Sequence, residues 1–252
     1  ERRRRPPHHR RRQGCRVKPY YEDEWVTLYH GDCREVLAEM SERSVASVLT
    51  DPPYTERTHL KARSLSGNTV TSGITTFGSI TDEDLRSALS ECGRVASRWV
   101  IATLDYRHAV EFDVNPPSGL RCQRIGVWVK TNPTPQLTGD RPAQGWEAIA
   151  YMHRADCRSS WNGGGKHGNY VSRIADATGH PTAKPLGILT DWVTQYSDPG
   201  ETLLDPFAGS GTTLVAAKAL GRKAIGVELE ERYCEIAARR LAQDVLDFGG
   251  AA

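Results

Sequence analysis

Two short segments of the chain combine residue types that could do chemistry. The first, Asp51-Pro52-Pro53-Tyr54, directly follows an apolar run. Consecutive prolines fix the backbone and remove two N–H donors, so the Asp51 carboxylate and the nearby carbonyls form a rigid wall of hydrogen-bond acceptors. Such a wall suits a ligand that donates from an amino group, and the Tyr54 ring offers a face for stacking a flat base. The alternative interpretation is a Pro-Pro turn that only ends a strand.

The second segment, residues 205–213, reads Asp-Pro-Phe-Ala-Gly-Ser-Gly-Thr-Thr between a strand-like and a helix-like run. Its glycines, Gly209 and Gly211, let the backbone turn sharply and approach a ligand at the helix N-terminus. Glu228 ends the next predicted strand, where nucleotide-binding α/β folds hold ribose hydroxyls. These features predict an adenosine-like cofactor, since a turn needed only for packing would not explain the acids. Leu214 stands where a dinucleotide fingerprint requires a small residue, which argues against NAD.

The sequence around these motifs alternates between short apolar strands and helical stretches, which predicts an α/β sheet. Strands are expected over 26–29, 45–50, 98–104, 124–130, 202–204 and 224–227, and helices over 34–40, 81–96, 186–196, 212–220 and 231–243. Both motifs therefore come directly after a predicted strand. Residues 55–80 lack periodicity and are rich in Thr, Ser and Gly, so we expect a long loop that serves the site.

The composition is typical of one large globular domain, with 252 residues of which 38% are hydrophobic and 25% charged. No run approaches the roughly 18 consecutive apolar residues of a membrane span, so we expect a cytoplasmic protein without a membrane partner. The six cysteines form no CxxC pair. His153, Cys157 and His167 lack fixed ligand spacing, so neither a disulfide framework nor a zinc site is expected.

The formal net charge of +2 hides an uneven distribution. Residues 1–18 hold nine Lys or Arg and one Glu, whereas the rest of the chain holds 24 Lys or Arg against 30 Asp or Glu. The body is therefore acidic, and any phosphate-binding surface must be a local patch. The Arg-rich segment 1–18 is predicted to be disordered. It is either an arm that grips phosphates, a solvated tail, or a stretch translated from the wrong start.

Taken together, the two motifs resemble those of the DNA methyltransferases that modify amino groups. The catalytic motif precedes the cofactor motif, which resembles the circularly permuted beta group, and the resemblance covers about residues 26–241. It implies a Rossmann-like methyltransferase fold: a mixed, mostly parallel sheet with helices on both faces. The domain is expected over 19–252, and the irregular stretch 131–181 is the candidate target-recognition insertion.

The resemblance also implies the roles of individual residues. Asp51, Pro52, Pro53 and Tyr54 would be catalytic. Gly31-Asp32 resembles the motif whose acid lies near the cofactor adenine, and residues 180–185, with Lys184, resemble the motif that closes the methionine pocket. The implied S-adenosylmethionine-binding residues are Asp32, Lys184, Asp205, Phe207, Gly209, Ser210, Gly211, Thr212 and Glu228.

The implied reaction is site-specific methylation of double-stranded DNA, with the target base flipped out of the stack. An Asp at the first position of the tetrapeptide resembles the adenine-N6 enzymes more than the cytosine-N4 enzymes, which remain the alternative. The lack of a Pro-Cys dipeptide argues against cytosine-C5 chemistry. Phosphate contacts in the insertion could come from Arg141, Arg154, Arg158, Lys166 and Arg173, or these could be ordinary surface charge.

Three rival functions stay open at this point: a dinucleotide-dependent oxidoreductase, a catalytically silent DNA-binding protein of the same fold, and an RNA methyltransferase. The short insertion and the lack of a nuclease motif suit an orphan methylase such as one carried by a phage; a member of a restriction-modification pair is the alternative. We expect a monomer or a homodimer.

Overall fold

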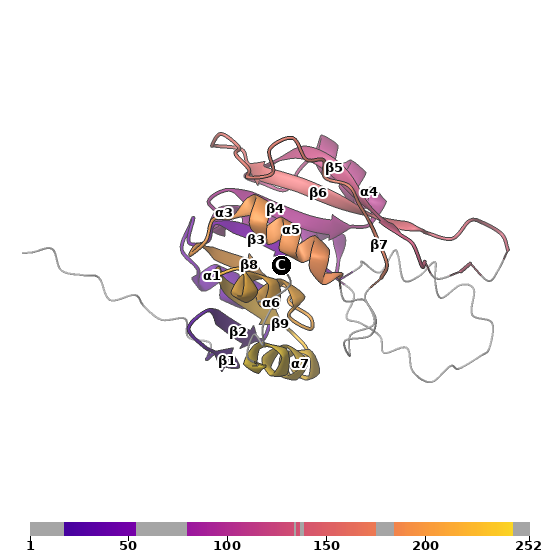
Figure 1. Ribbon diagram of the computed structural model, residues 1–252. Coiled ribbons are helices and arrows are strands. Elements are labelled where there is room, and N and C mark those ends of the chain that lie inside the picture. Colours follow the sequence, from indigo (N-terminus) through magenta and orange to yellow (C-terminus); the bar gives the residue numbers. More distant parts are fainter. Residues whose placement is uncertain (1–17, 54–79, 134, 137–138, 175–183, 244–252) are drawn as a thin grey trace, which may run out of the picture.

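The computed structural model describes residues 18–53, 80–133, 135–136, 139–174 and 184–243 (Figure 1). Tyr54, nearly all of the predicted loop 55–80 and residues 1–17 of the Arg-rich segment lie outside the described residues. The strands are β1 (Tyr21–Glu22), β2 (Val26–His30), β3 (Ser47–Thr50), β4 (Trp99–Leu104), β5 (Leu120–Lys130), β6 (Trp146–Arg154), β7 (Tyr170–Ser172), β8 (Thr202–Asp205) and β9 (Lys223–Glu228). The helices are α1 (Cys33–Glu39), α3 (Asp82–Val95), α4 (Tyr106–Val114), α5 (Leu186–Tyr196), α6 (Thr212–Ala219) and α7 (Glu231–Ala242).

The strands form one sheet in the order β1-β2-β9-β8-β3-β4-β6-β5-β7. The block from β2 to β4 is parallel throughout. By contrast, β1 is antiparallel to β2, and β6 is antiparallel to both β4 and β5. The predicted mixed, mostly parallel sheet is therefore confirmed.

Each face of the sheet carries its own hydrophobic core, because the helices cover both faces (Figure 1). Successive strand residues point to opposite faces, so Leu49 belongs to one core and Val48 to the other. The core on the Leu49 side is completed by α5, α6 and α7, with Trp192 as its largest fully buried side chain. The core on the Val48 side is completed by α1, α3 and α4. Burial on both faces explains why apolar residues follow one another without alternation in the central strands, as at 48–49 of β3 and 99–102 of β4.

The two motif-bearing strands, β3 and β8, are parallel neighbours, with Val48 opposite Leu204. From β8 the chain passes through α6 to β9, and from β3 it continues to α3 and β4. Because α6 and α3 contribute to opposite cores, the crossovers leave β8 and β3 on different faces. Ligands of open α/β sheets bind at the carboxyl ends of the strands flanking such a reversal. The fold thus brings the two motifs to one crevice.

Residues 131–181 are not uniformly irregular, which corrects the sequence-based interpretation. Nine of them form β6, which lies inside the sheet between β4 and β5 and is buried in every position except Trp146. A further short strand, β7, pairs with β5 at the sheet edge. The candidate insertion is therefore reduced to the segments on either side of β6.

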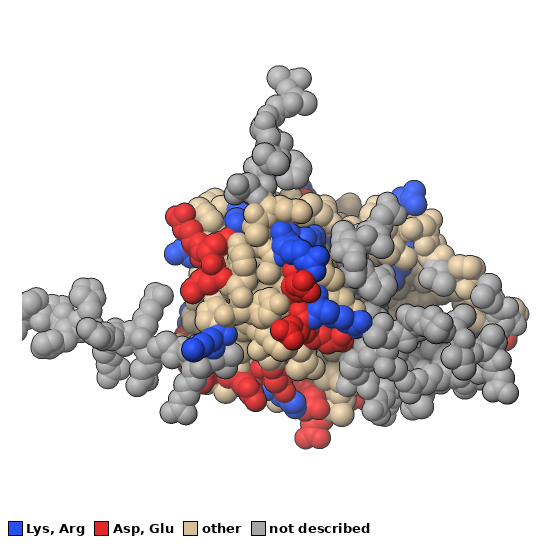
Figure 2. Space-filling model, turned by 90° about the horizontal axis from the view of Figure 1, so that it is seen from below, with Lys and Arg blue, Asp and Glu red and all other residues tan. Residues whose placement is uncertain are grey.

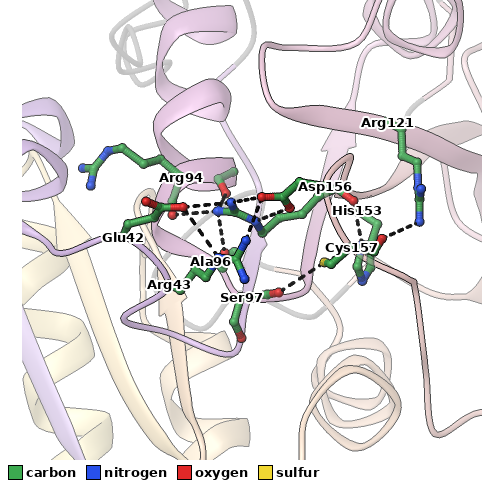
Figure 3. Close-up of polar contacts among 11 residues, drawn as sticks. Glu42, Arg43, Arg94, Ala96, Ser97, Arg121, His153, Asp156 and Cys157 are labelled. Carbon is green, nitrogen blue, oxygen red and sulfur yellow. Dashed lines mark hydrogen bonds and ion pairs between the residues drawn. The ribbon is translucent and has the colours of Figure 1, made fainter.

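Arg154, at the end of β6, corrects a second expectation, because it is not available as a phosphate contact. Its side chain is only 8% exposed. The guanidinium donates to the carbonyls of Gly93 and Arg94 at 3.0 and 3.1 Å and pairs with Glu42 and Asp156 at 2.9 and 2.6 Å (Figure 3). A cation at the last carbonyls of α3 is stabilised by the helix dipole. Arg154 therefore anchors β6 to α3.

The surface around β1 and α7 carries both signs of charge. Figure 2 shows acidic and basic side chains interspersed on this side of the molecule. On α7, Arg239 pairs with Glu235 at 2.7 Å, and at its start Arg232 pairs with Glu230 at 2.6 Å. The described charges on this side therefore form no single-sign field for a polyanion. Among the described residues, no helix is both long and apolar enough to cross a bilayer.

Candidate active site

A cavity of about 340 Å³ opens at the carboxyl ends of β3, β8 and β9. Among the residues predicted from the sequence, those lining it are Asp32, Asp51, Pro52, Pro53, Lys184, Asp205, Phe207, Gly209, Ser210, Thr212 and Glu228. The exceptions are Gly211, which packs elsewhere, and Tyr54, which lies outside the described residues. The structure therefore brings nearly all predicted site residues to one cavity, although they come from both ends of the chain.

The two glycines of the second motif have different surroundings. Gly209, at φ +52°, lines the cavity, and its N–H donates to Glu228 Oε2 at 2.8 Å. Gly211, at φ +78°, precedes α6, and a Cβ there would lie 2.8 Å from Ala237 Cβ on α7. Left-handed backbone favours glycine at both positions. Gly209 belongs to the site, whereas Gly211 allows α6 and α7 to pack closely.

Arg240 of α7 holds the same turn and was not anticipated from the sequence. Its Nη1 donates to the Ser210 carbonyl at 2.6 Å and to the Ser210 and Thr212 hydroxyl oxygens at 3.1 Å each. Burial lowers the pKa of this guanidinium. A fixed turn leaves less conformational entropy to lose when a ligand binds.

Glu228 ends β9 and faces the cavity with both carboxylate oxygens partly engaged. Oε1 accepts from the Glu230 N–H and Oε2 from the Gly209 N–H, both at 2.8 Å. A carboxylate has about four acceptor sites, so roughly two remain for a ligand with hydroxyl donors. Burial raises the pKa of Glu228.

Asp205 ends β8 beneath the glycine turn and is only 4% exposed. Its Oδ1 accepts from the Thr50 hydroxyl at 2.8 Å and from the Phe207 N–H at 3.2 Å. Burial raises the pKa of Asp205 to about 6, although hydrogen bonds from Thr213 and Thr50 oppose that shift. Asp205, the first residue of the second motif, thus connects the end of β8 to the end of β3.

Asp32 caps α1 and reaches the rim of the cavity. It accepts from the Arg34 N–H at 2.9 Å and pairs with the Arg34 guanidinium at 2.6 Å. Hydrogen bonds from Arg34 lower the pKa of Asp32. Arg34 in turn reaches Asp84 of α3 at 2.8 Å. The Asp32 carboxylate therefore caps α1, forms an ion pair with Arg34 and lines the cavity.

Asp51, at the end of β3, forms the opposite end of the cavity. Its Oδ2 accepts from Lys184 Nζ at 2.6 Å, and its Oδ1 accepts from the Thr103 hydroxyl on β4. The side chain still keeps about a third of its surface exposed, at 32%. Each oxygen retains acceptor capacity beyond these bonds. The carboxylate is consequently oriented but still accessible from the cavity.

Glu147 and Lys130 complete this end of the cavity and were missed from the sequence. Glu147, the second residue of β6, pairs with Lys184 Nζ at 3.0 Å and with Lys130 Nζ. Recognition of β6 as a buried strand would have been the signal, because a charged residue inside such a strand requires a partner. Thr103, whose hydroxyl contacts Asp51, was also missed, although it is the penultimate residue of a strand that was predicted.

His153 and Cys157 lie at the far end of β6, away from the cavity. Cys157 Sγ is 3.9 Å from His153 Nδ1 and 3.8 Å from the Ser97 carbonyl (Figure 3). Burial lowers the pKa of His153. Within the described ranges, no group of three His, Cys, Asp or Glu side chains could hold a metal ion.

Comparisons with known proteins agree with this geometry. The sequence model of the N6/N4 DNA methylase family matches residues 45–239. Type II methyltransferase M2.LlaDCHI of Lactococcus lactis subsp. cremoris is 30% identical, over 89% of this chain and 92% of its own length. Type II methyltransferase M.HinfI of Haemophilus influenzae is 29% identical, over 90% and 71% respectively. The crystal structure of the M1.HpyAVI–SAM complex shares the fold, with a TM-score of 0.65 at 23% identity, over 86% of this chain and 99% of that one.

Proposed function

The chain belongs to the N6/N4 DNA methylase family, and from this premise we propose that it transfers the methyl group of S-adenosylmethionine to N6 of adenine in double-stranded DNA. The observation that carries the proposal is the single cavity with the Asp51 acceptor wall at one end and the Gly209–Glu228 turn at the other. The first end suits an amino donor, and the second suits an adenosine.

The chemistry of the cofactor end fits S-adenosylmethionine. Glu228 keeps free acceptor sites for ribose hydroxyls, and Gly209 brings backbone to the cavity wall. Apolar surface for an adenine ring comes from Phe207, Leu229 and Tyr233, which line the same cavity. When bound, the cofactor supplies an electrophilic methyl group on a positively charged sulfur. We assign its binding to these residues together with Asp32, Asp205, Ser210 and Thr212.

The acceptor end overcomes the weak nucleophilicity of a base amine. The lone pair of that nitrogen is delocalised into the ring, so attack requires the pair to be localised. Hydrogen bonds from the amine to Asp51 and to the Pro52 carbonyl favour a tetrahedral nitrogen and stabilise the positive charge that develops on it. The preset orientation of Asp51 aligns the amine without a reorganisation cost. Pro53 fixes the same turn, and we assign base stacking to Tyr54.

Two exposed aromatic side chains support an approach of DNA to this edge of the sheet. Tyr106 and Trp146 are 41% and 37% exposed, and their ring centroids lie 6.2 Å apart. The Arg107 guanidinium stacks on Tyr106 at 5.2 Å. Trp146 directly precedes Glu147 on β6, so this pair lies near the Asp51 end of the cavity without lining it. We propose that it contacts DNA beside the flipped base, in which case Trp146→Ala lowers DNA affinity measured by fluorescence anisotropy; unchanged affinity would contradict this.

We assign target recognition to the segments of 131–181 that flank β6, and phosphate contacts to the Arg-rich segment 1–18. The protein would act in the cytoplasm of a bacterium or of a phage-infected cell, as a monomer or homodimer. The sequence argument for adenine rests on the Asp at the first position of the tetrapeptide.

The deciding experiment is transfer of a labelled methyl group from S-adenosylmethionine to unmethylated genomic DNA, followed by nucleoside digestion and mass analysis. We expect N6-methyladenine, with an Asp51→Ala preparation as the inactive control. Detection of N4-methylcytosine would support the same mechanism but contradict adenine as the target base. In a parallel reaction, label in RNA but not in DNA would contradict the proposal that DNA is the substrate. Cofactor binding without methyl transfer would favour a silent DNA-binding protein.

A further inference from the structure

A buried lysine stands next to the proposed catalytic carboxylate. The Lys184 side chain is only 9% exposed, and its ammonium lies between Asp51 Oδ2 at 2.6 Å and Glu147 Oε2 at 3.0 Å. Burial opposes the charged form, but the two carboxylates outweigh it and raise the pKa of Lys184. A buried ammonium needs such partners, because a buried charge without compensation is strongly unfavourable. The charged groups around Lys184 thus fix it on Asp51.

The ion pairs continue beyond Lys184 as an alternating chain. Glu147 also binds the Lys130 ammonium, and the two lysines lower the pKa of Glu147 to about 2 against the effect of its burial. The ammonium groups of Lys130 and Lys184 lie 5.1 and 5.6 Å from the centroid of the Trp128 ring. An aromatic face attracts cations. The sequence of charges Asp51, Lys184, Glu147, Lys130 therefore rests on a rigid platform of β5 and β6.

This arrangement gives Lys184 a different role from the one its sequence motif implies. We propose that Lys184 is a positioning residue for Asp51, held in place by Glu147, and that it does not act by binding the cofactor. The proposal rests on the proposed function, since it concerns the carboxylate that receives the base amine. Lys184 and Thr103 each take one oxygen of Asp51, which sets the plane of the carboxylate.

The network also predicts how turnover depends on pH. Among the described residues, the charged groups nearest the Asp51 carboxylate are Lys184 before α5, Glu147 on β6 and Asp205 on β8, with Lys130 on β5 behind Glu147. Lys184 is the one cation of this set in contact with Asp51. Its removal takes away the positive charge in contact with the Asp51 carboxylate, so we expect the acid limb of the kcat profile to move to higher pH. Removal of the Glu147 charge leaves Asp51 as the one carboxylate of this set paired with Lys184. We therefore expect the acid limb of the kcat profile to move to lower pH.

The test compares Lys184→Met and Glu147→Gln in the full chain. For Lys184→Met we expect kcat to fall about 100-fold, the acid limb to move up, and the calorimetric Kd for S-adenosylmethionine to stay within about twofold. Glu147→Gln should move the acid limb down, which a merely structural ion pair would not do. Lys184→Arg keeps the charge and should restore part of kcat and the original acid limb.

Lys218→Met is the matched control, because Lys218 is also a shielded lysine in a 2.6 Å ion pair, with Asp23, but lies away from the cavity. It should lower stability without moving kcat or the pH profile. A Lys184→Met enzyme with a Kd raised tenfold or more and unchanged kcat would overturn the proposal in favour of cofactor binding. So would acid limbs that stay in place in both variants. The calorimetric comparison needs no turnover, so it stays informative even if wild-type protein fails to methylate DNA.

Discussion

The two ends of the active-site cavity hold their carboxylates in opposite ways. At the base end, Asp51 and Glu147 are paired with lysine ammonium groups at 2.6 and 3.0 Å. At the cofactor end, Glu228 and Asp205 are held by backbone N–H groups and a threonine hydroxyl, with no ion pair to either among the described residues. Asp32, on the rim of that end, differs from them because it pairs with Arg34. The pKa shifts follow this difference: lysines lower the pKa of Glu147, and burial raises the pKa values of Asp205 and Glu228.

The difference matches what each end has to bind. In the proposed reaction the base end receives a neutral amine that becomes positive only as the new bond forms, so its acceptor must be fixed in advance. The cofactor end receives a ligand that already carries a positive sulfur, and acids without cationic partners attract such a ligand. We therefore propose that ion pairs with lysine orient the acceptor at the base end, and that Glu228 and Asp205, which lack such pairs, contribute to cofactor affinity at the other.

The sharpest test of this comparison is Asp51→Ala. Loss of the acceptor should lower kcat about 1,000-fold, because a preorganised polar group that stabilises developing charge contributes on that scale. Binding of S-adenosylmethionine, measured by calorimetry, should remain within about twofold of wild type. Near-normal turnover of this variant would remove Asp51 from the mechanism, and a large loss of cofactor affinity would mean that the two ends are not separable.

The contrast between ion-paired and buried, unpaired carboxylates can also be tested through the pH dependence of the free energy of unfolding. Asp205 has a folded pKa of about 6 against an ordinary value of 3.8, so the folded state keeps a proton that the unfolded chain has lost. The free energy of unfolding should therefore fall by about 2 kcal/mol as pH rises from about 4 to above 6, roughly 30-fold in the folding equilibrium. Asp205→Asn should lack this component when the two proteins are compared by urea unfolding at pH 4, 5, 6 and 7.

Glu147 should show the opposite sign. Its pKa is lowered from 4.5 to about 2, so the stability that it contributes is present above about pH 4.5 and is lost as pH falls toward 2. Glu147→Gln should thus converge with wild type in acid, whereas Asp205→Asn diverges from wild type as pH rises. Parallel curves for both variants would contradict the contrast between the two ends.

A further test uses the first motif glycine, Gly209. Gly209→Val places a branched side chain at φ +52° on the cavity wall and should raise the Kd for S-adenosylmethionine about 20-fold, at little cost to kcat under saturation. Gly187→Ala is the control, because a Cβ at Gly187 meets nothing within 4 Å. Equal Kd values for both variants would show that the turn does not need glycine for ligand approach.

The sequence predicted the cofactor end better than the base end, for a physical reason. The turn from Asp205 to Gly209 and the acid Glu228 are read from local signals: apolar runs, glycines and strand ends. Helix α5 was predicted with its observed bounds, and the other predicted elements lie within a few residues of theirs. These signals are local in the sequence, so they can be recognised without knowing which strands pair in the sheet.

The base end depends on contacts that sequence patterns do not carry. The interior strand β6 was missed because both of its faces are buried, which removes the alternation that marks a strand, and because it contains Glu147, His153 and Arg154. Lys184 was assigned to the cofactor because its motif implies that pocket; the contact of its ammonium with Asp51, 133 residues away, has no signal in the sequence. The short helix α4 was also missed; it makes its contacts mainly with β5 and β6.

The smallest expected effect concerns Glu228, whose carboxylate is held by two backbone N–H groups that a substitution of its side chain leaves in place. Glu228→Gln keeps one oxygen for the Gly209 N–H but loses a charged acceptor for ribose hydroxyls, so the Kd for S-adenosylmethionine should rise about fivefold. The effect should be nearly the same for S-adenosylhomocysteine if the ribose contact dominates, because that product keeps the ribose and lacks the positive sulfur. If the Kd rises for S-adenosylmethionine alone, the acid acts on the sulfonium charge instead. No change for either ligand would mean that the unpaired acids of the cofactor end do not set affinity, and the comparison of the two ends would fail on that side.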